Sequence, residues 1–226
     1  AIIDSGNFDW SSGKFSEFTE PSAGYHGLVY HDVLGKAAFI AKIRIEGLRD
    51  FGSALSPFNG FQIIQGLETL PVRIKKHSEN ALQLAQWLEQ QPQVAWVNYP
   101  GLPSSKYHDL AQTYLPEGQS GLVTFGLKAG YEAAKTVVSE TKLFSLLANF
   151  GDTKSLIIHP ASTTHQQLSQ ESQEATGVTH DLIRISAGLE DVQDLIADLQ
   201  RVFYIISSQE SKNGSTQNHN IETSIA

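Results

Sequence analysis

Short apolar runs alternate with helical segments between residues 91 and 206, and this alternation constrains the fold more than any other feature of the sequence. Runs rich in Val, Ile and Leu that are bounded by Pro, Gly or polar residues are typical of strands. Strands separated by helices or long connections predict a small α/β domain. The predicted strands are Val94–Val97, Leu122–Leu127, Ser155–His159 and Leu182–Ser186, and the predicted helices are Ala133–Val138 and a segment after Gly188 that opens with Glu190 and Asp191.

The clearest helix is predicted over Val72–Glu89. Ala81, Leu84, Ala85 and Leu88 recur there at the i, i+3, i+4, i+7 spacing that gathers apolar side chains into one stripe. A helix with a single apolar stripe buries that stripe against a core, so the sequence predicts that this helix packs against other elements.

The N-terminal region has a less regular pattern. Ala1–Asp4 is largely apolar and predicts a short strand, whereas Ser5–Tyr30 is interrupted by glycines and predicts an ordered loop. From Val33 the apolar spacing becomes helical. After a break at Pro57, a second apolar helix is predicted over Phe58–Leu70.

The composition changes near residue 90, and the sequence therefore predicts two domains. Residues 1–90 form the first and residues 91–206 the second. Residues 207–226 are polar and lack periodicity, which predicts a disordered tail. With 40% hydrophobic residues, the chain as a whole has enough apolar material for a packed core.

The charge balance and the residues that are absent exclude several classes of function. The 16 Lys and Arg against 24 Asp and Glu give a formal net charge of −8, which argues against nucleic-acid binding, since that needs a basic surface. The absence of Cys excludes disulfides, thiolate catalysis and Cys-based zinc sites. No apolar run reaches the roughly 18 residues of a membrane span, and no signal-peptide pattern is present, so a cytoplasmic protein is expected.

Arg184 is the residue that points most directly to chemistry. It lies between Ile183 and Ile185, so strand alternation places it on the face opposite those two side chains. A planar guanidinium can hold a carboxylate through two hydrogen bonds. From the spacing alone, an arginine at such a position is more commonly exposed or part of a structural ion pair. A role in binding a ligand is the alternative.

Catalytic motifs and histidines give weaker evidence for a functional site than Arg184 does. The sequence has no phosphate-binding loop, no HExxH pair and no GxSxG turn. His26 and His31 lie close together in a predicted loop, which is only a weak pattern for a metal site. His159 and His165 flank a short segment and are best interpreted as hydrogen-bonded loop histidines, so no metal ligand is predicted.

A series of sequence blocks is more specific than any single motif: Gly66–Arg73, His77–Ala81, Tyr99–Leu102, Ala148–Leu156, His159–His165 and Leu182–Asp191. In this order and spacing, the blocks resemble the Cys/Met metabolism family of pyridoxal-phosphate enzymes, and the resemblance extends from Ala1 to about Phe203. It implies the α/β fold of the C-terminal part of a fold-type I transferase dependent on pyridoxal phosphate. Residues 1–90 would end the large cofactor-binding domain, and residues 91–206 would form a small domain with a mainly antiparallel sheet and flanking helices.

The resemblance implies roles for five residues. Arg184 matches the arginine that holds the α-carboxylate of the amino-acid substrate. Asn149 lies where the family places a Ser or Asn beside that carboxylate, and Phe150 supplies neighbouring backbone. Thr164 matches a hydroxyl near the pocket, and Asp50 matches a polar position near its mouth. For Thr164 and Asp50, local hydrogen bonding in a loop or at a helix end is an equal alternative.

Within the family, Ala148 and the loop at Gly24–Gly27 resemble the O-acetylhomoserine sulfhydrylase branch. Cystathionine γ-lyases tend to carry Glu at the position of Ala148, where a carboxylate could hold the amino group of a cysteine substrate. The resemblance therefore implies a γ-replacement in methionine and cysteine biosynthesis that converts O-acetylhomoserine and sulfide to homocysteine and acetate. A cystathionine γ-synthase or γ-lyase, or a non-catalytic paralogue or partner subunit, stays as the alternative.

The family's lysine that binds pyridoxal 5'-phosphate, together with most of its other cofactor contacts, matches no residue of this chain. The chain has no Met and opens on an apolar run, so we expect that lysine upstream of Ala1 and no catalytic residue or independent activity within these residues. The resemblance also implies a small amino-acid substrate, no nucleic-acid or membrane partner, and a homodimer or homotetramer in the complete enzyme.

Overall fold

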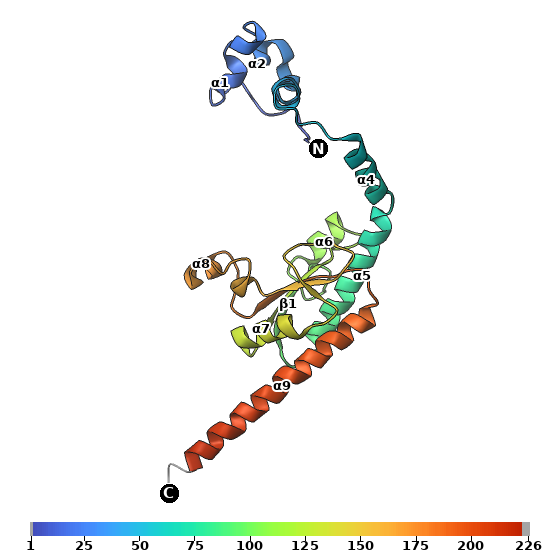
Figure 1. Ribbon diagram of the computed structural model, residues 1–226, viewed down its shortest axis with the longest axis vertical. Helices are drawn as coiled ribbons and strands as arrows, with labels where there is room; N and C mark the ends of the chain where they lie inside the picture. The colour runs from blue at the N-terminus through green and yellow to red at the C-terminus, as the bar shows by residue number, and fades with distance from the viewer. Residues whose placement is uncertain (1, 223–226) are drawn as a thin grey trace. The chain divides into compact units, whose positions relative to one another are not determined.

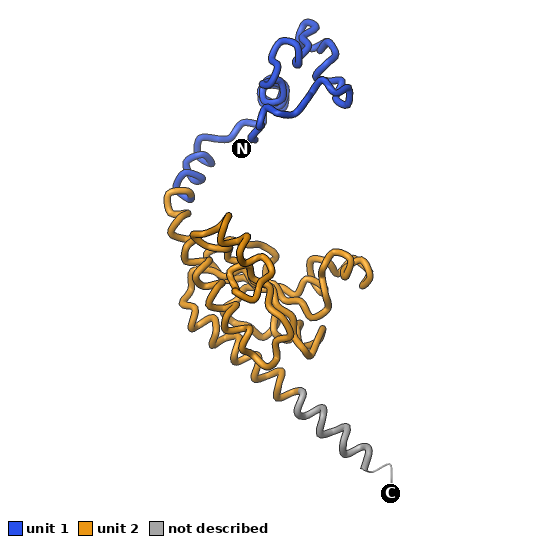
Figure 2. The backbone as a smooth tube through the Cα atoms, turned by 180° about the vertical axis from the view of Figure 1, so that it is seen from behind, with its two compact units in different colours: residues 1–66 blue, residues 67–226 orange. Residues whose placement is uncertain are grey.

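The computed structural model describes the backbone of residues 2–222 and the side chains of residues 2–209. The chain forms two compact units, residues 1–66 and residues 67–226 (Figure 2). The division between these units falls within α4 (Pro57–Glu68), and the domain boundary near residue 90 stays a prediction. α5 (Leu70–Glu89) belongs to the second unit, because its buried apolar stripe packs in the core of that unit and against its sheet.

A five-stranded sheet forms the centre of the second unit, with the strand order β1-β2-β5-β4-β3. The pairs β1–β2, β2–β5 and β4–β5 are antiparallel, and only β3–β4 is parallel. The mainly antiparallel sheet predicted for the α/β fold is therefore confirmed. The strands are β1 (Val94–Asn98), β2 (Leu122–Leu127), β3 (Ser145–Leu146), β4 (Leu156–Ile158) and β5 (Leu182–Ser186).

The predicted strands agree closely with this sheet. β2 and β5 have the predicted bounds, and β1 and β4 differ from the prediction by a single residue at one or both ends. β3 is not predicted, because a strand of two residues is too short to show an alternation of apolar and polar positions.

Three helices pack against the sheet, namely α5, α7 (Gly130–Glu140) and α9 (Val192–Glu222) (Figure 1). β2 and β5 place their apolar side chains toward one core, because Val123 lies opposite Ile185 and Phe125 lies opposite Ile183. Smaller elements lie in the connections and are not predicted from the sequence: α6 (His108–Tyr114), α8 (Gln170–Ala175) and the 3-10 helix η4 (Pro160–Ser162).

The longest helix, α9, extends further than the sequence predicts. Leu195 and Leu199 are fully buried in the core of the second unit. The helix continues to Glu222 and so takes in most of residues 207–226, for which the sequence predicts disorder, while residues 223–226 lie outside the described part. A polar helical segment shows no apolar periodicity, which explains the difference. Among the described residues, no helix combines the length and apolar character needed to cross a membrane.

The first unit consists of short helices around a small aromatic core. Phe18, Tyr30 and Ala38 are buried, and Trp10 stacks on Phe39 with ring centroids 4.9 Å apart. The elements before α4 are α1 (Ser16–Thr19), the 3-10 helix η1 (Ala23–Tyr25), α2 (Tyr30–Leu34), the 3-10 helix η2 (Gly35–Ala37), α3 (Ala38–Lys42) and the π-helix η3 (Ile43–Leu48).

Two predictions for this unit are wrong. Residues 2–4 of the predicted strand are irregular, because they pair with no other strand in the described chain. The predicted loop Ser5–Tyr30 contains the short helices α1 and η1. The helical segment predicted from Val33 begins at Tyr30 and is interrupted at Gly35, whose φ of 50° lies outside the right-handed helical region.

Candidate functional site

Arg184 occupies the middle of β5 and has a neighbouring strand on each side. It lies opposite Thr124 on β2 and opposite Ile158 on β4. Because Ile183 and Ile185 point into the core, the side chain of Arg184 emerges on the other face of the sheet, where the residue is half-buried. This face carries the candidate substrate site.

The guanidinium of Arg184 contacts a loop that is distant in the sequence. Its Nη2 atom donates a hydrogen bond to the backbone carbonyl of Asn149 over 3.2 Å. The Oδ1 atom of Asn149 accepts a hydrogen bond from the backbone N–H of Phe150 at 2.9 Å, and the Phe150 side chain is 66% exposed. The fold thus brings together Arg184, Asn149 and Phe150, for which the sequence predicts substrate binding.

Arg184 has no carboxylate partner among the described side chains. A guanidinium carries five N–H donors in a planar fork, and the contacts described for Arg184 use one of its groups, at Asn149. A structural ion pair is therefore excluded within the described residues, and the remaining donors can hold a carboxylate from outside the chain. Ion pairs elsewhere in the described residues include Lys42–Glu46, Lys135–Glu132 and Arg201–Asp198, and none of them involves Arg184.

A second hydrogen bond holds the Asn149 loop against β5. The Oγ atom of Ser186, a buried residue, accepts it from the backbone N–H of Gly151 at 3.1 Å. Gly151 has a φ of 73°, in the left-handed region that favours glycine. The sequence does not single out Ser186 or Gly151 individually, and their position inside the matched sequence blocks is the only signal that could have found them.

Thr164 and Asp50 each have a hydrogen-bonding partner within the chain. Thr164 is exposed, and its Oγ1 atom lies 2.8 Å from Nδ1 of the adjacent His165. Asp50, in the first unit, accepts a hydrogen bond from the hydroxyl of Tyr25 at 2.9 Å. The pKa of Tyr25 is raised, mainly because its hydroxyl loses hydration and to a lesser extent because of this hydrogen bond. The Thr164 contact is of the local kind that the sequence left open, whereas the Asp50 contact joins residues 25 positions apart, and a pocket role for either residue stays a prediction.

His159 is fully buried and hydrogen-bonded at both ring nitrogens. Its Nδ1 atom lies 2.8 Å from Oγ of Ser162, and its Nε2 atom lies 2.8 Å from the backbone carbonyl of His180. The ring of Tyr131 meets the imidazole edge to face, with centroids 4.9 Å apart. Because a carbonyl can only accept, the neutral imidazole carries its proton on Nε2. These contacts fit the hydrogen-bonded loop histidine that the sequence favours.

The buried state of His159 predicts a pH dependence of stability. Burial lowers the pKa of His159 below the ordinary value of 6.5, against the opposing effect of the hydrogen bond to His180. As the pH falls, the unfolded chain therefore binds a proton before the folded chain does. We expect the free energy of unfolding to be maintained above pH 6.5 and to decrease below it.

Urea unfolding between about pH 7.5 and pH 5.5 measures this effect. His159→Gln keeps an N–H group for the His180 carbonyl but does not titrate, so its stability should depend less steeply on pH than that of the wild type. Parallel pH profiles for the two proteins would show that His159 does not cause the decrease.

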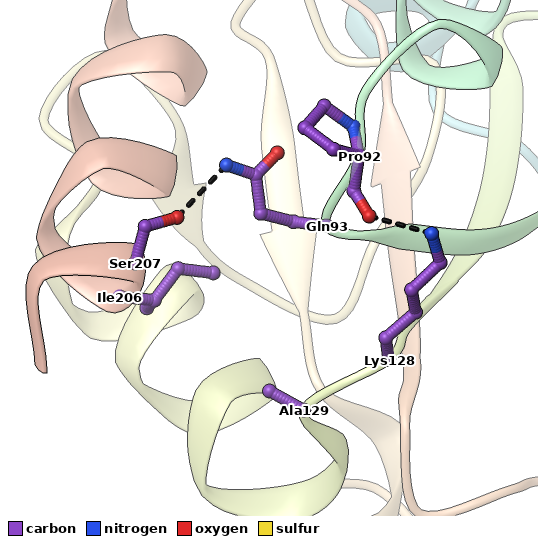
Figure 3. A pocket seen from close by; sticks show the side chains of 6 residues that line it. All are labelled: Pro92, Gln93, Lys128, Ala129, Ile206 and Ser207. Atoms are coloured by element: carbon purple, nitrogen blue, oxygen red, sulfur yellow. Dashed lines mark hydrogen bonds between the residues drawn. The ribbon is translucent and has the colours of Figure 1, made fainter. Parts of the chain in front are cut away.

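A separate hollow of about 220 Å³ lies where β1 begins, β2 ends and α9 passes (Figure 3). Nζ of Lys128 donates a hydrogen bond to the carbonyl of Pro92 at 2.6 Å, and Nε2 of Gln93 donates to Oγ of Ser207 at 2.9 Å. These bonds join the three elements. None of the residues for which the sequence predicts substrate binding lines this hollow, so it is a weaker candidate for a substrate site than the face around Arg184.

Comparison with known proteins identifies one family. The model of Cys/Met metabolism PLP-dependent enzymes matches residues 18–204. O-acetyl-L-homoserine sulfhydrylase 1 of Thermus thermophilus is 54% identical over 200 residues, which cover 88% of this chain and 48% of that protein. Homocysteine/cysteine synthase of Saccharomyces cerevisiae is 47% identical over 214 residues, which cover 89% of this chain and 48% of that protein.

A solved structure agrees with these relatives. A candidate O-acetylhomoserine (thiol)-lyase of Campylobacter jejuni, with N'-pyridoxyl-lysine-5'-monophosphate in its structure, matches with a TM-score of 0.74 at 47% identity. The match covers 83% of this chain and 44% of that chain. The chain thus spans about half the length of the relatives it matches. Since the family model matches most of the sequence and the fold agrees with it, this chain belongs to the Cys/Met metabolism family of PLP-dependent enzymes.

Proposed function

We propose that this chain is the part of an O-acetylhomoserine sulfhydrylase that binds the α-carboxylate of the amino-acid substrate. The observation that carries the proposal is the half-buried guanidinium of Arg184, which is held by the Asn149 carbonyl and has no carboxylate partner among the described residues. The complete enzyme would convert O-acetylhomoserine and sulfide to homocysteine and acetate. The names of the relatives from Thermus thermophilus and Leptospira meyeri support this reaction.

The role of Arg184 in this reaction is to bind and orient the substrate. Two parallel N–H donors can hold both oxygens of a carboxylate, which fixes its plane as well as its position. The hydrogen bond to Asn149 leaves part of the fork available for this purpose. A fixed carboxylate restricts the orientation of the rest of the amino acid, and such positioning contributes to rate without any proton transfer by Arg184.

The described lysines do not fit the role of the lysine that binds pyridoxal phosphate. Such a lysine needs an amine whose pKa is lowered by burial or by a neighbouring cation. Lys42 and Lys76 are half-buried and the other described lysines are exposed. Lys42 is moreover paired with Glu46 at 2.6 Å. We therefore propose that the cofactor is held mainly by the other half of the complete protein, and we assign it no contact with the residues described here.

Ala148 supports sulfide as the second substrate. It directly precedes Asn149, and its methyl side chain has no group that could hold the amino group of a cysteine substrate. A cystathionine γ-synthase or γ-lyase and a non-catalytic subunit are the alternatives. We also propose that the complete protein acts in the cytoplasm, and the family resemblance supports a homodimer or homotetramer.

An assay of the complete protein tests the proposal. With O-acetylhomoserine saturating, sulfide, methanethiol and cysteine are compared as acceptors, and the thiol or thioether products are quantified by chromatography. We expect the highest kcat/KM with sulfide, and we expect no turnover by residues 1–226 alone. A preference for cysteine, or no turnover of O-acetylhomoserine by the complete protein, would contradict the assignment as a sulfhydrylase.

A further inference from the structure

The Asn149 loop and the end of β5 are joined by hydrogen bonds at a constant offset of 35 residues. The first joins Arg184 to Asn149, and the second joins Ser186 to Gly151. The same offset recurs at Glu190 and Ser155. The two segments therefore lie side by side and run in the same direction, with the substrate-binding pair at one end and the Glu190–Ser155 pair at the other.

The Glu190–Ser155 pair is the strongest of these contacts. The backbone N–H of Ser155 donates to Oε1 of Glu190 at 2.7 Å, and its hydroxyl donates to Oε2 at 2.8 Å. Hydrogen bonds to a carboxylate are roughly twice as strong as bonds between neutral groups. The Oγ atom of Ser155, which is fully buried, also accepts a bond from the backbone N–H of Gly188 at 2.8 Å. One serine thus joins the loop to two residues, Gly188 and Glu190, of the segment that follows β5.

Helix α5 holds the same segment from another direction. Nδ2 of Asn80 donates to the carbonyls of Gly188 and Glu190, both at 2.9 Å. Nδ1 of His77 lies 2.6 Å from the carbonyl of Ala187. Asn80 and His77 are both buried. The segment after β5 is therefore held in place on α5. Because Glu190 belongs to this segment, its bonds to Ser155 hold the Asn149 loop in place as well.

We propose that Glu190 and Ser155 are positioning residues for substrate binding: they hold the Asn149 loop in register with β5, so that the Asn149 carbonyl orients the guanidinium of Arg184. This inference rests on the proposed function, because it assumes that Arg184 binds the substrate carboxylate. Without the Glu190–Ser155 pair, the loop keeps its contacts to β5, Gly188 and Leu189 but loses both bonds to a carboxylate, and the guanidinium samples orientations that do not match a substrate carboxylate. Displacements of about 1 Å at a reacting centre are enough to reduce rates strongly.

A double-mutant cycle in the complete protein tests this role. Glu190→Ala should raise the KM for O-acetylhomoserine about tenfold while kcat changes less, because binding of the carboxylate is weakened. In the Arg184→Ala background, Glu190→Ala should cause no further rise in KM, because the group that it positions is already absent. Glu190→Gln keeps one oxygen acceptor for Ser155 and should give an intermediate KM. Glu117→Ala removes the same charge from an exposed position and should leave KM unchanged.

Thermal unfolding of each variant separates positioning from folding. A Glu190→Ala protein with a lower Tm but an unchanged KM would overturn the proposal, and so would equal rises in KM in the Arg184 and Arg184→Ala backgrounds. If Glu190→Ala does not fold, the same comparison is made with Glu190→Gln.

The double-mutant cycle is measured with O-acetylhomoserine or with cystathionine, whichever of the two the wild type converts. Failure of the sulfhydrylase assignment therefore appears in the wild type, whereas failure of the positioning role appears only in the variants.

Discussion

Replacing Arg184 with alanine is expected to raise the KM of the complete protein for O-acetylhomoserine by about 100-fold. This is equivalent to about 3 kcal/mol, the upper part of the range for hydrogen bonds to a charged group. The reason is that the guanidinium is held by Asn149 with donors left over and has no ion-pair partner among the described residues. Steady-state kinetics at saturating sulfide measures the effect, and KM should change more than kcat.

Two variants serve as controls for this prediction. Arg184→Lys keeps the positive charge but loses the planar fork, so its KM should lie between those of the wild type and Arg184→Ala. Arg201→Ala removes an arginine that is bonded within the fold, to Asp198 at 2.8 Å, and should lower the Tm without changing KM. If KM for Arg184→Ala were the same as for the wild type, the carboxylate-binding role and the proposed function that depends on it would both be wrong.

Replacing Gly188 with alanine is expected to lower the free energy of unfolding by about 3 kcal/mol, the upper part of the range for overpacked sites. A Cβ atom at Gly188 would lie 2.5 Å from the backbone nitrogen of Ser155 and 2.5 Å from the backbone oxygen of Thr153, and would also collide with the Glu190 carboxylate. Backbone atoms cannot move aside as the end of a flexible side chain can, so the strain must be taken up by separating the segments. Urea unfolding of the chain measures the loss.

Gly24→Ala is the matched control for this substitution. A Cβ atom at Gly24 would meet no atom within 4 Å, and Gly24 does not need a positive φ, so this variant should differ little from the wild type in stability. A Gly188→Ala protein with wild-type stability would mean that the Ser155 segment can move away from β5 at little cost. In that case the close approach of the two segments would not be a rigid feature of the fold.

Much of the second unit follows from local sequence patterns. The alternation of Val123 and Phe125 on one strand and of Ile183 and Ile185 on another predicts both strands and the face that each presents to the core. The apolar stripe of α5 is equally visible in the sequence. Apolar periodicity does not predict an element where the pattern is short or missing, as in β3 and the polar end of α9. It also fails in the first unit, whose short helices are interrupted by glycine.

Glu190 shows most clearly what a local pattern misses. In the sequence it opens, together with Asp191, the helix predicted after Gly188, where negative charges are favourable. In the structure the neighbouring Asp191 takes this place, because its Oδ1 atom accepts a hydrogen bond from the backbone N–H of Gln193 at 2.8 Å. The carboxylate of Glu190 instead binds Ser155, which lies 35 residues away in the sequence. No spacing within one element could have predicted that contact.

The sequence by itself determined the strands, the main helices, the family resemblance and the exceptional position of Arg184 in an apolar strand, because burial and strand alternation act between near neighbours. Only the tertiary structure decided that Arg184 contacts Asn149 rather than a carboxylate of the chain, and that Glu190 binds Ser155. The physical reason is that a hydrogen bond depends on the position of two groups in space, and that position is set by how β5, its following segment and α5 pack together.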